Sequence, residues 1–388
     1  MPDPAVPDPA VPDPAVPART ERPLLSTSAV LGEGPDAAVP EHYGAPLREQ
    51  RRLLRRRAVV DLGQLEVLEL SGSDARSWLT TISSQVLTGV PVGTGASLAV
   101  LTPQGRVEHL ASAVVTGEES VLLVTDAGAR AGLRRYLEMM RFAARVEITD
   151  RDDLRVLGAR GPAGEVLAGT GLDLPEPVAV WDDRWPHVAP GGVAYGPDPE
   201  DPSGAMLTVL DAAVLEALPW QAEHLAGMSS WEALRIADHR ARQAREVDER
   251  SIPHELDLLR TAVHTAKGCY RGQETVAKVM NLGQPPRRLV MLHVDGSQDV
   301  PVTPGGEVRL GGADGKVVGT VTSAALHADL GPIALAVVRR AVPLDAPLHL
   351  AVTLAGTGED ATTLWLDATQ EPIVVSREHG QRPATAKL

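Results

Sequence analysis

The single cysteine of this 388-residue chain lies in a run of eight residues, Lys267 to Glu274, whose side chains could do chemistry. One of the chain's four lysines precedes that cysteine by two residues, and a cation near a thiol favours the reactive thiolate. Gly268 and Gly272 permit backbone conformations that let a ligand come close. Such a loop could hold a flat heterocycle with amide edges and an anionic tail. A structural turn with a buried, inert cysteine is the alternative interpretation.

Residue types that bind metals do not come together elsewhere in the sequence. His254 and His264 are ten residues apart with Glu255 beside the first, which is not a known ligand spacing. One cysteine excludes an intramolecular disulfide and a four-cysteine iron–sulfur site within one chain. We therefore expect no metal site in this chain alone.

Composition limits the class of protein. The formal net charge of −14 argues against a nucleic-acid-binding protein, because phosphate contacts need clustered lysine and arginine. Five arginines between Arg51 and Arg57 form one basic cluster, for which we expect a solvated helix face. The sequence contains no apolar run of about 18 residues, so no membrane span is expected. The N-terminus lacks the pattern of a signal peptide, and we expect a cytoplasmic protein.

The elements that position the loop begin after a long leader. Residues 2–16 are three copies of Pro-Asp-Pro-Ala-Val, which predict an extended, acidic tail. Residues 18–45 remain rich in proline and glycine, so 1–45 is predicted to be a disordered leader. A body follows over 46–285, a β-barrel domain over 286–374 and a flexible tail over 375–388.

Apolar periodicity in the body alternates between strands and helices without a regular βαβ order. Strands are predicted at 65–70, 97–101, 107–115 and 121–124, and again at 145–149 and 154–159. Asp126 is a suitable N-cap for a helix to about Phe142. A capping box, Ser229 to Glu232, predicts a second helix that continues to about Val247. The pattern indicates an α+β fold.

Two further segments complete the expected architecture. Trp181 and Trp185 lie in a stretch, 161–205, that is rich in glycine, proline and aspartate, and they could stack on a ligand ring. Covering a hydrophobic cluster is the preferred interpretation. After Pro286, short strands separated by glycine turns predict a small antiparallel barrel or sandwich.

The loop resembles the KGCYxGQE signature of the YgfZ-type folate-binding proteins. These proteins are relatives of the glycine-cleavage T-protein (aminomethyltransferase) and are linked to iron–sulfur cluster assembly and repair. The resemblance extends over roughly 46–354. It implies a T-protein-like body, a ring of subdomains around a central opening that holds tetrahydrofolate or a one-carbon derivative, followed by the barrel. All seven defined positions match: Lys267, Gly268, Cys269, Tyr270, Gly272, Gln273 and Glu274.

The resemblance implies that the signature loop lines the folate site. Lys267 and Gln273 are then the expected polar contacts, and Glu274 bonds within the loop or to the pterin. Tyr270 is equally expected to pack or to stack. Glu108 is a further candidate, because it and His109 stand where T-proteins carry paired aspartates.

Three functions follow from the resemblance. The first is a tetrahydrofolate-binding factor that supports iron–sulfur cluster assembly or repair, with assembly proteins or client enzymes as partners. The second is a folate-dependent aminomethyltransferase, with Glu108 or His109 in place of the aspartates and Ala237 in place of a folate-binding glutamate. The third is a non-catalytic scaffold or thiol-based redox factor, in which Cys269 is the candidate reactive group. A monomer is expected.

Overall fold

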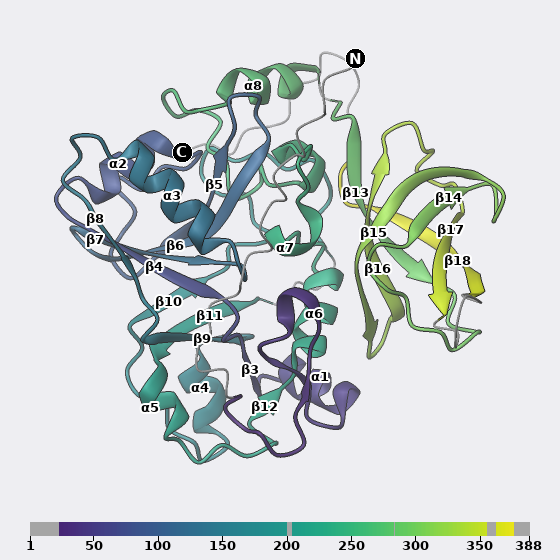
Figure 1. Ribbon diagram of the computed structural model, residues 1–388, viewed down its shortest axis with the longest axis horizontal. Helices are drawn as coiled ribbons and strands as arrows, with labels where there is room; N and C mark the ends of the chain where they lie inside the picture. Colours follow the sequence, from purple (N-terminus) through teal and green to yellow (C-terminus); the bar gives the residue numbers. More distant parts are fainter. Residues whose placement is uncertain (1–22, 200–203, 283, 355–361, 376–388) are drawn as a thin grey trace, which may run out of the picture.

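The computed structural model describes residues 23–199, 204–282, 284–354 and 362–375. The extended leader expected at 2–16 and the tail expected after residue 375 lie outside these ranges. Two five-stranded sheets form the body, and a closed barrel lies beside them (Figure 1). Helix α6 (Met228–Ala237) lies between the second sheet and the barrel. This arrangement confirms the predicted α+β class.

The first sheet is antiparallel, and helices α2 (Ala75–Ile82) and α3 (Arg130–Met140) pack on it. Residues Leu133, Tyr136 and Leu137 of α3 are buried against it, as their helical spacing predicts. Helix α3 begins four residues after the predicted N-cap. The strands, in spatial order, are β5 (Gly95–Leu101), β6 (Val107–Gly117), β7 (Ser120–Thr125), β4 (Glu66–Ser71) and β8 (Glu147–Asp150).

The second sheet is antiparallel except at one edge, where β12 pairs with β3 in parallel. This edge joins residues about 165 positions apart, since Val59 pairs with Leu225. Helices α1 (Pro46–Leu54), α4 (Ala163–Ala168) and α5 (Ala212–Glu216) surround the sheet. Its strands, in order, are β10 (Ala179–Asp182), β11 (Met206–Asp211), β9 (Leu154–Ala159), β3 (Val59–Asp61) and β12 (Leu225–Ala226).

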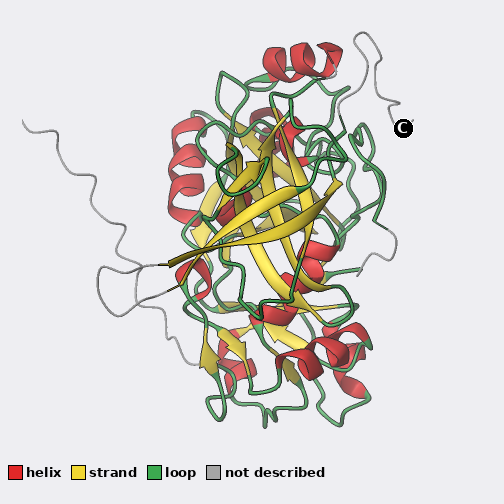
Figure 2. Cartoon of the chain, turned by 90° about the vertical axis from the view of Figure 1, so that its right-hand side faces the viewer, coloured by secondary structure: helices red, strands yellow, loops and turns green. Residues whose placement is uncertain are grey.

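Six antiparallel strands close the C-terminal barrel around an aliphatic core, as predicted (Figure 2). The last two strands were not predicted. In spatial order the strands are β13 (Arg287–Val294), β16 (Gly331–Arg339), β15 (Lys316–His327), β14 (Glu307–Leu310), β17 (Leu348–Leu354) and β18 (Thr362–Pro372).

Helix α6 differs from its prediction at both ends. Its N-cap is Gly227, and no side chain caps it, so the predicted capping box is wrong. The carboxylate of Glu232 instead bonds two arginines in the interior. The helix ends at Ala237, because His239 adopts a left-handed backbone conformation (φ 61°). A short helix, α7 (Gln243–Glu246), then replaces the expected continuation.

The end of the predicted leader is not irregular, because residues 30–42 form two short strands and a turn. Strands β1 (Val30–Leu31) and β2 (Pro40–His42) flank a 3₁₀ turn, Gly34–Asp36. The turn is held down because the Asp36 carboxylate is buried and pairs with two arginines after α6. Sequence composition does not reveal this partner.

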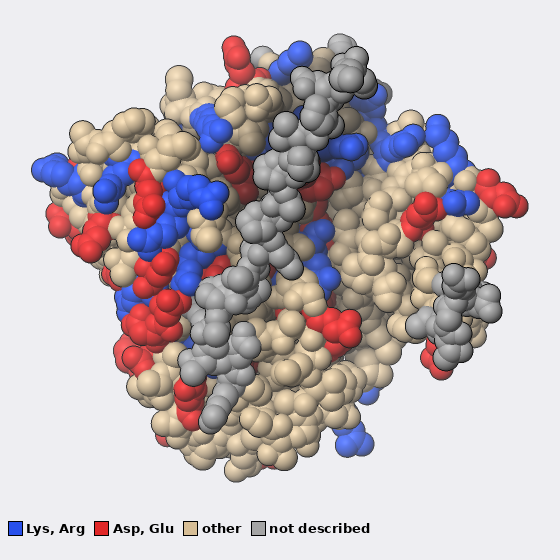
Figure 3. Space-filling model, viewed as in Figure 1, with Lys and Arg blue, Asp and Glu red and all other residues tan. Residues whose placement is uncertain are grey.

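Acidic and basic side chains are interspersed over the described surface in the view of Figure 3. Among the described residues, no helix is long and apolar enough to cross a membrane.

Candidate functional site

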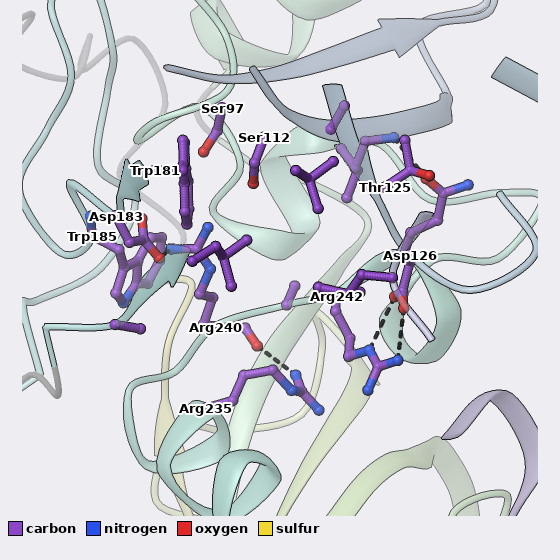
Figure 4. A pocket seen from close by; sticks show the side chains of 18 of the residues that line it. Ser97, Ser112, Thr125, Asp126, Trp181, Asp183, Trp185, Arg235, Arg240 and Arg242 are labelled. Carbon is purple, nitrogen blue, oxygen red and sulfur yellow. Dashed lines mark hydrogen bonds and ion pairs between the residues drawn. The ribbon is translucent and has the colours of Figure 1, made fainter. Parts of the chain in front are cut away.

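A cavity of about 170 Å³ lies where the first sheet, the second sheet and α6 meet (Figure 4). This volume is smaller than the roughly 300–1,000 Å³ of typical ligand pockets, so it can enclose one ring system of a larger ligand. Its wall is mostly apolar, with polar groups from both sheets. Apolar residues of the wall include Leu62, Leu98, Leu110, Val124, Leu207, Met228, Trp231 and Leu234.

Two serine hydroxyls project from the first sheet into the cavity. Ser97 on β5 and Ser112 on β6 are directly opposite each other in the register of the two strands. Figure 4 shows both side chains on the same side of the sheet, with their oxygens directed into the cavity. Neither hydroxyl has a hydrogen-bond partner within the described part of the chain, and each therefore has its bonding capacity available to a ligand.

Strand β10 and the segments that follow β10 and α6 contribute an aromatic and cationic wall. The guanidinium of Arg240 lies 5.2 Å from the ring centre of Trp181 and 5.9 Å from that of Trp185. The guanidinium of Arg260 lies 5.0 Å from the Trp185 ring, and Asp183 pairs with Arg240. Trp181 is only 4% exposed and belongs to the hydrophobic core between the two sheets. The preferred interpretation of this tryptophan is therefore correct, although both rings also line the cavity.

Arg242 connects three parts of the molecule at the edge of the cavity. Its guanidinium bonds Asp126 at the end of β7 (2.6 Å), Asp36 of the N-terminal turn (2.9 Å) and Glu232 of α6 (3.1 Å). Charge-assisted bonds of this kind are the stronger hydrogen bonds in proteins. Desolvation by burial raises the pKa of Glu232, but the positive charges of Arg235 and Arg242 outweigh it and lower that pKa to about 2.

Every carboxylate that lines the cavity among the described residues already has a partner. Asp126 accepts hydrogen bonds from Arg242, and Asp183 pairs with Arg240. Asp238 also has an interaction partner. The cavity therefore presents hydroxyls and aromatic surface, with no unpaired acid.

The signature lysine has its ammonium group engaged by the protein. Lys267 Nζ donates to the carbonyl of Ser83 (2.6 Å) and to that of Thr80, at the end of α2. The ammonium also lies 5.0 Å from the ring centre of Tyr270. Partial burial lowers the pKa of Lys267 to about 8. In this arrangement the lysine caps a helix C-terminus, where a cation is favourable.

The other signature residues divide between packing and solvent. Tyr270 is buried, and burial raises its pKa. Cys269 is exposed, so it is not the inert buried residue of the alternative interpretation. Gln273 and Glu274 begin helix α8 (Gln273–Leu282). The Gln273 amide donates to the Lys267 carbonyl at 3.4 Å, within the loop.

None of the seven signature residues, nor Glu108, is among the residues that line this cavity. Their expected role as folate contacts stays a prediction. Gly268 has no left-handed conformation, whereas Gly272 does (φ 83°). The loop contacts the strand that carries two cavity residues, Leu110 and Ser112, because Arg271 pairs with Glu108 of β6 at 3.1 Å.

Glu108 and His109 lie at a β-bulge between β5 and β6. Bulges often re-aim side chains next to functional sites. His109 packs on α3, where Gly132 leaves space for its ring, and burial lowers its pKa. The Gln243 side chain, which lines the cavity, accepts from the Leu110 amide at 2.7 Å and donates to the Glu108 carbonyl.

Sequence reasoning considered Trp181 and Trp185 as ligand contacts but missed the polar residues that line the cavity. A serine within each of two apolar strands, Ser97 and Ser112, is a weak signal that a polar group faces a cavity. The two arginines after α6, Arg240 and Arg242, carry no such signal, because their partners are distant in the chain. No group of three or more histidine, cysteine or acidic residues in the described segments could hold a metal ion.

Comparisons with known proteins agree with this architecture, although no family model matches. The chain is 28% identical over 276 residues to the chloroplastic protein At1g60990 of Arabidopsis thaliana, which is named as a transferase. That match covers 68% of this chain and 61% of the plant protein. A shorter match, 24% identical over 139 residues, covers 36% of this chain and 37% of the aminomethyltransferase of Nitrosococcus oceani.

The fold is similar to the crystal structure of the glycine cleavage system aminomethyltransferase T of Bartonella henselae. The TM-score is 0.67 at 16% identity, covering 91% of this chain and 96% of that one. These similarities place the chain in the aminomethyltransferase-like superfamily of the glycine-cleavage T-protein. The aligned region spans about three fifths of the plant relative's length.

Proposed function

We propose that this protein binds a reduced folate, tetrahydrofolate or a one-carbon derivative, with the pterin ring in the cavity between the two sheets. The observation that carries the proposal is the unpaired hydroxyl pair of Ser97 and Ser112 in an otherwise apolar and aromatic wall. Ligand sites are typically apolar with a few placed polar groups. Relatives named as aminomethyltransferases support the same ligand class.

The folate fits the chemistry of the residues present. A pterin is a flat ring with amide-like edges, and it needs an apolar slot with hydrogen-bonding groups at its rim. The volume of about 170 Å³ suits the ring, and leaves the tail with its carboxylates outside.

Titration with tetrahydrofolate under anaerobic conditions tests the proposal. Because Trp181, Trp185 and Trp231 line the cavity, binding should quench the intrinsic fluorescence saturably. Ala241→Phe places a ring in the cavity and should abolish the signal. Ala131→Phe, on the exposed side of α3, is the matched control and should bind as the wild type does. Absence of saturable binding to the wild-type protein would refute the proposal.

Aminomethyl transfer is the second candidate, and the relatives named as transferases favour it. Against it stands the lining of the cavity, in which each described carboxylate is already paired. Transfer chemistry depends on acid–base groups placed at the reacting atoms. We expect no methylene-tetrahydrofolate above background from an aminomethylated lipoyl carrier protein. Its formation at a rate dependent on this protein would establish the transferase instead.

A supporting role for iron–sulfur enzymes is the finer part of the proposal. It depends on the signature loop, whose thiol at Cys269 is exposed. A single thiolate can ligate one corner of a cluster, so a partner would have to supply the remaining ligands. In a deletion strain, Cys269→Ser should restore less iron–sulfur enzyme activity than the wild-type gene. Full restoration by the serine variant would exclude a role for the thiol.

A further inference from the structure

We infer that the hydroxyls of Ser97 and Ser112 form the subsite that binds the polar edge of the ligand's ring, with the indole of Trp181 as the apolar wall beside it. This inference rests on the proposed folate function and adds which residues determine ring recognition. The ligand class is a flat heterocycle with neighbouring carbonyl and amino or N–H groups on one edge.

Strand register fixes the spacing of the two hydroxyls. Ser97 and Ser112 are directly opposed across β5 and β6, so their Cβ atoms are roughly 4.5–5.5 Å apart. Val124 on β7 continues the row as the partner of Ser112. The two strands lie within a five-stranded sheet, and the hydroxyls are therefore held by rigid backbone.

The backbone of β5 also positions the tryptophan. Gly95 lies two residues before Ser97, hence on the same face of the strand. A side chain at Gly95 would approach Trp181 Cδ1 to 3.0 Å and the Ala113 carbonyl oxygen to 2.1 Å. Glycine thus allows the indole to lie against the strand next to the serine pair. An apolar ring wall and two edge-binding groups are thus brought together by the paired strands β5 and β6.

The two serine hydroxyls suit a ring edge that carries both a hydrogen-bond donor and a hydrogen-bond acceptor. A hydroxyl donates one hydrogen bond and accepts others, so one serine can serve a carbonyl and the other an amino group. A pyrimidine ring that carries such groups on both sides of one nitrogen presents them with a spacing similar to that of opposed strand positions. Replacement of one partner would leave a buried polar group of the ring unsatisfied, which costs affinity.

Calorimetric titration of the full-length protein tests the inference with three probes: tetrahydrofolate, a tetrahydropterin that lacks the tail, and 4-aminobenzoylglutamate, which lacks the ring. Ser97→Ala combined with Ser112→Ala should weaken the binding of tetrahydrofolate and of the pterin by about tenfold or more, since two hydrogen bonds are lost. Binding of 4-aminobenzoylglutamate, however weak, should not change.

A second hydroxyl pair on the same sheet supplies the control. Thr116 and Ser120 bond each other at 2.9 Å and do not line the cavity. Thr116→Val with Ser120→Ala should leave all three affinities within twofold of the wild type. Thermal unfolding of each variant shows whether it is folded.

The outcomes separate the inference from the function on which it rests. If the wild-type protein binds neither tetrahydrofolate nor the pterin, the folate proposal fails. If it binds both and the folded double-serine variant binds them equally well, the folate proposal stands and the serine subsite is refuted. If the double-serine variant selectively loses binding of the two ring-containing probes, the serine subsite is supported.

Discussion

His254 has no exposed surface, and its ring is enclosed by the loop and helix that follow it. Its Nε2 contacts the Val276 carbonyl at 3.0 Å, and its ring meets Tyr195 edge-on at 5.5 Å. Burial lowers the pKa of His254 to about 4, although the bond to Val276 opposes this. The imidazole is thus neutral in the folded protein at neutral pH.

The lowered pKa predicts a loss of stability in acid. Between an unfolded pKa of about 6.5 and the folded value of about 4, the unfolded chain binds the proton more readily. The free energy of unfolding should therefore fall as pH drops through this window, by about 3 kcal/mol from this group.

Urea denaturation of the wild type and of His254→Gln at pH 7, 5.5 and 4 measures this contribution. The glutamine variant should have the flatter pH profile, because an amide does not titrate. His187→Gln, on an exposed loop, is the control and should keep the wild-type slope. Parallel profiles for wild type and His254→Gln would contradict the prediction.

At the scale of elements, the signature loop is packed on the turn that precedes β6. Gly105 and Gly272 both have left-handed backbones (φ 76° and 83°). A Cβ on Gly272 would lie 2.6 Å from the Thr102 carbonyl oxygen and 2.9 Å from the Gly105 Cα. Two constraints therefore require glycine at position 272, namely its left-handed backbone and the close approach of the neighbouring backbone.

Two glycines of one loop give a matched pair of variants. Gly272→Ala should lower the free energy of unfolding by about 2 kcal/mol, because the new methyl group meets backbone atoms and its φ is unfavourable. Gly268→Ala should be nearly neutral, since no atom lies within 4 Å of the added Cβ. Chemical denaturation at neutral pH compares them. Equal effects of the two substitutions would overturn this account.

Local periodicity predicted most strands of the body and the buried residues of α3. In these elements, apolar residues recur along the chain with the period of a strand or of a helix. It failed at α6, where Glu232 is recruited by Arg242 from a later segment. The cavity was missed for the same reason. Its polar residues are brought together by strand register and by ion pairs between distant segments, which no single stretch of sequence contains.

At the scale of the whole molecule, Arg242 is the residue that joins the N-terminal turn, the first sheet and α6. Its side chain is only 11% exposed. Removal of one partner from a buried charge network leaves the others uncompensated, which typically costs about 3–5 kcal/mol. We expect the three parts to separate more easily without it.

Arg242→Ala should accordingly lower the free energy of unfolding by about 3 kcal/mol or more. Adding Asp126→Asn to that variant should recover part of the loss, because it removes one unpaired charge. Arg141→Ala, at an exposed position, is the control and should change stability little. A double variant no better than Arg242→Ala would show that the Asp126 charge is not the source of the cost.

The parallel pairing of β3 with β12 has a consequence for biosynthesis. The edge of the second sheet is complete only after Leu225 has been synthesised, because Val59 pairs with it. The residues that line the cavity extend further along the chain, to Ala262. Most of the polypeptide has therefore been synthesised before the cavity in which we propose that folate binds is complete. A folate bound as proposed would therefore act on the nearly complete chain and would not guide the early nascent chain.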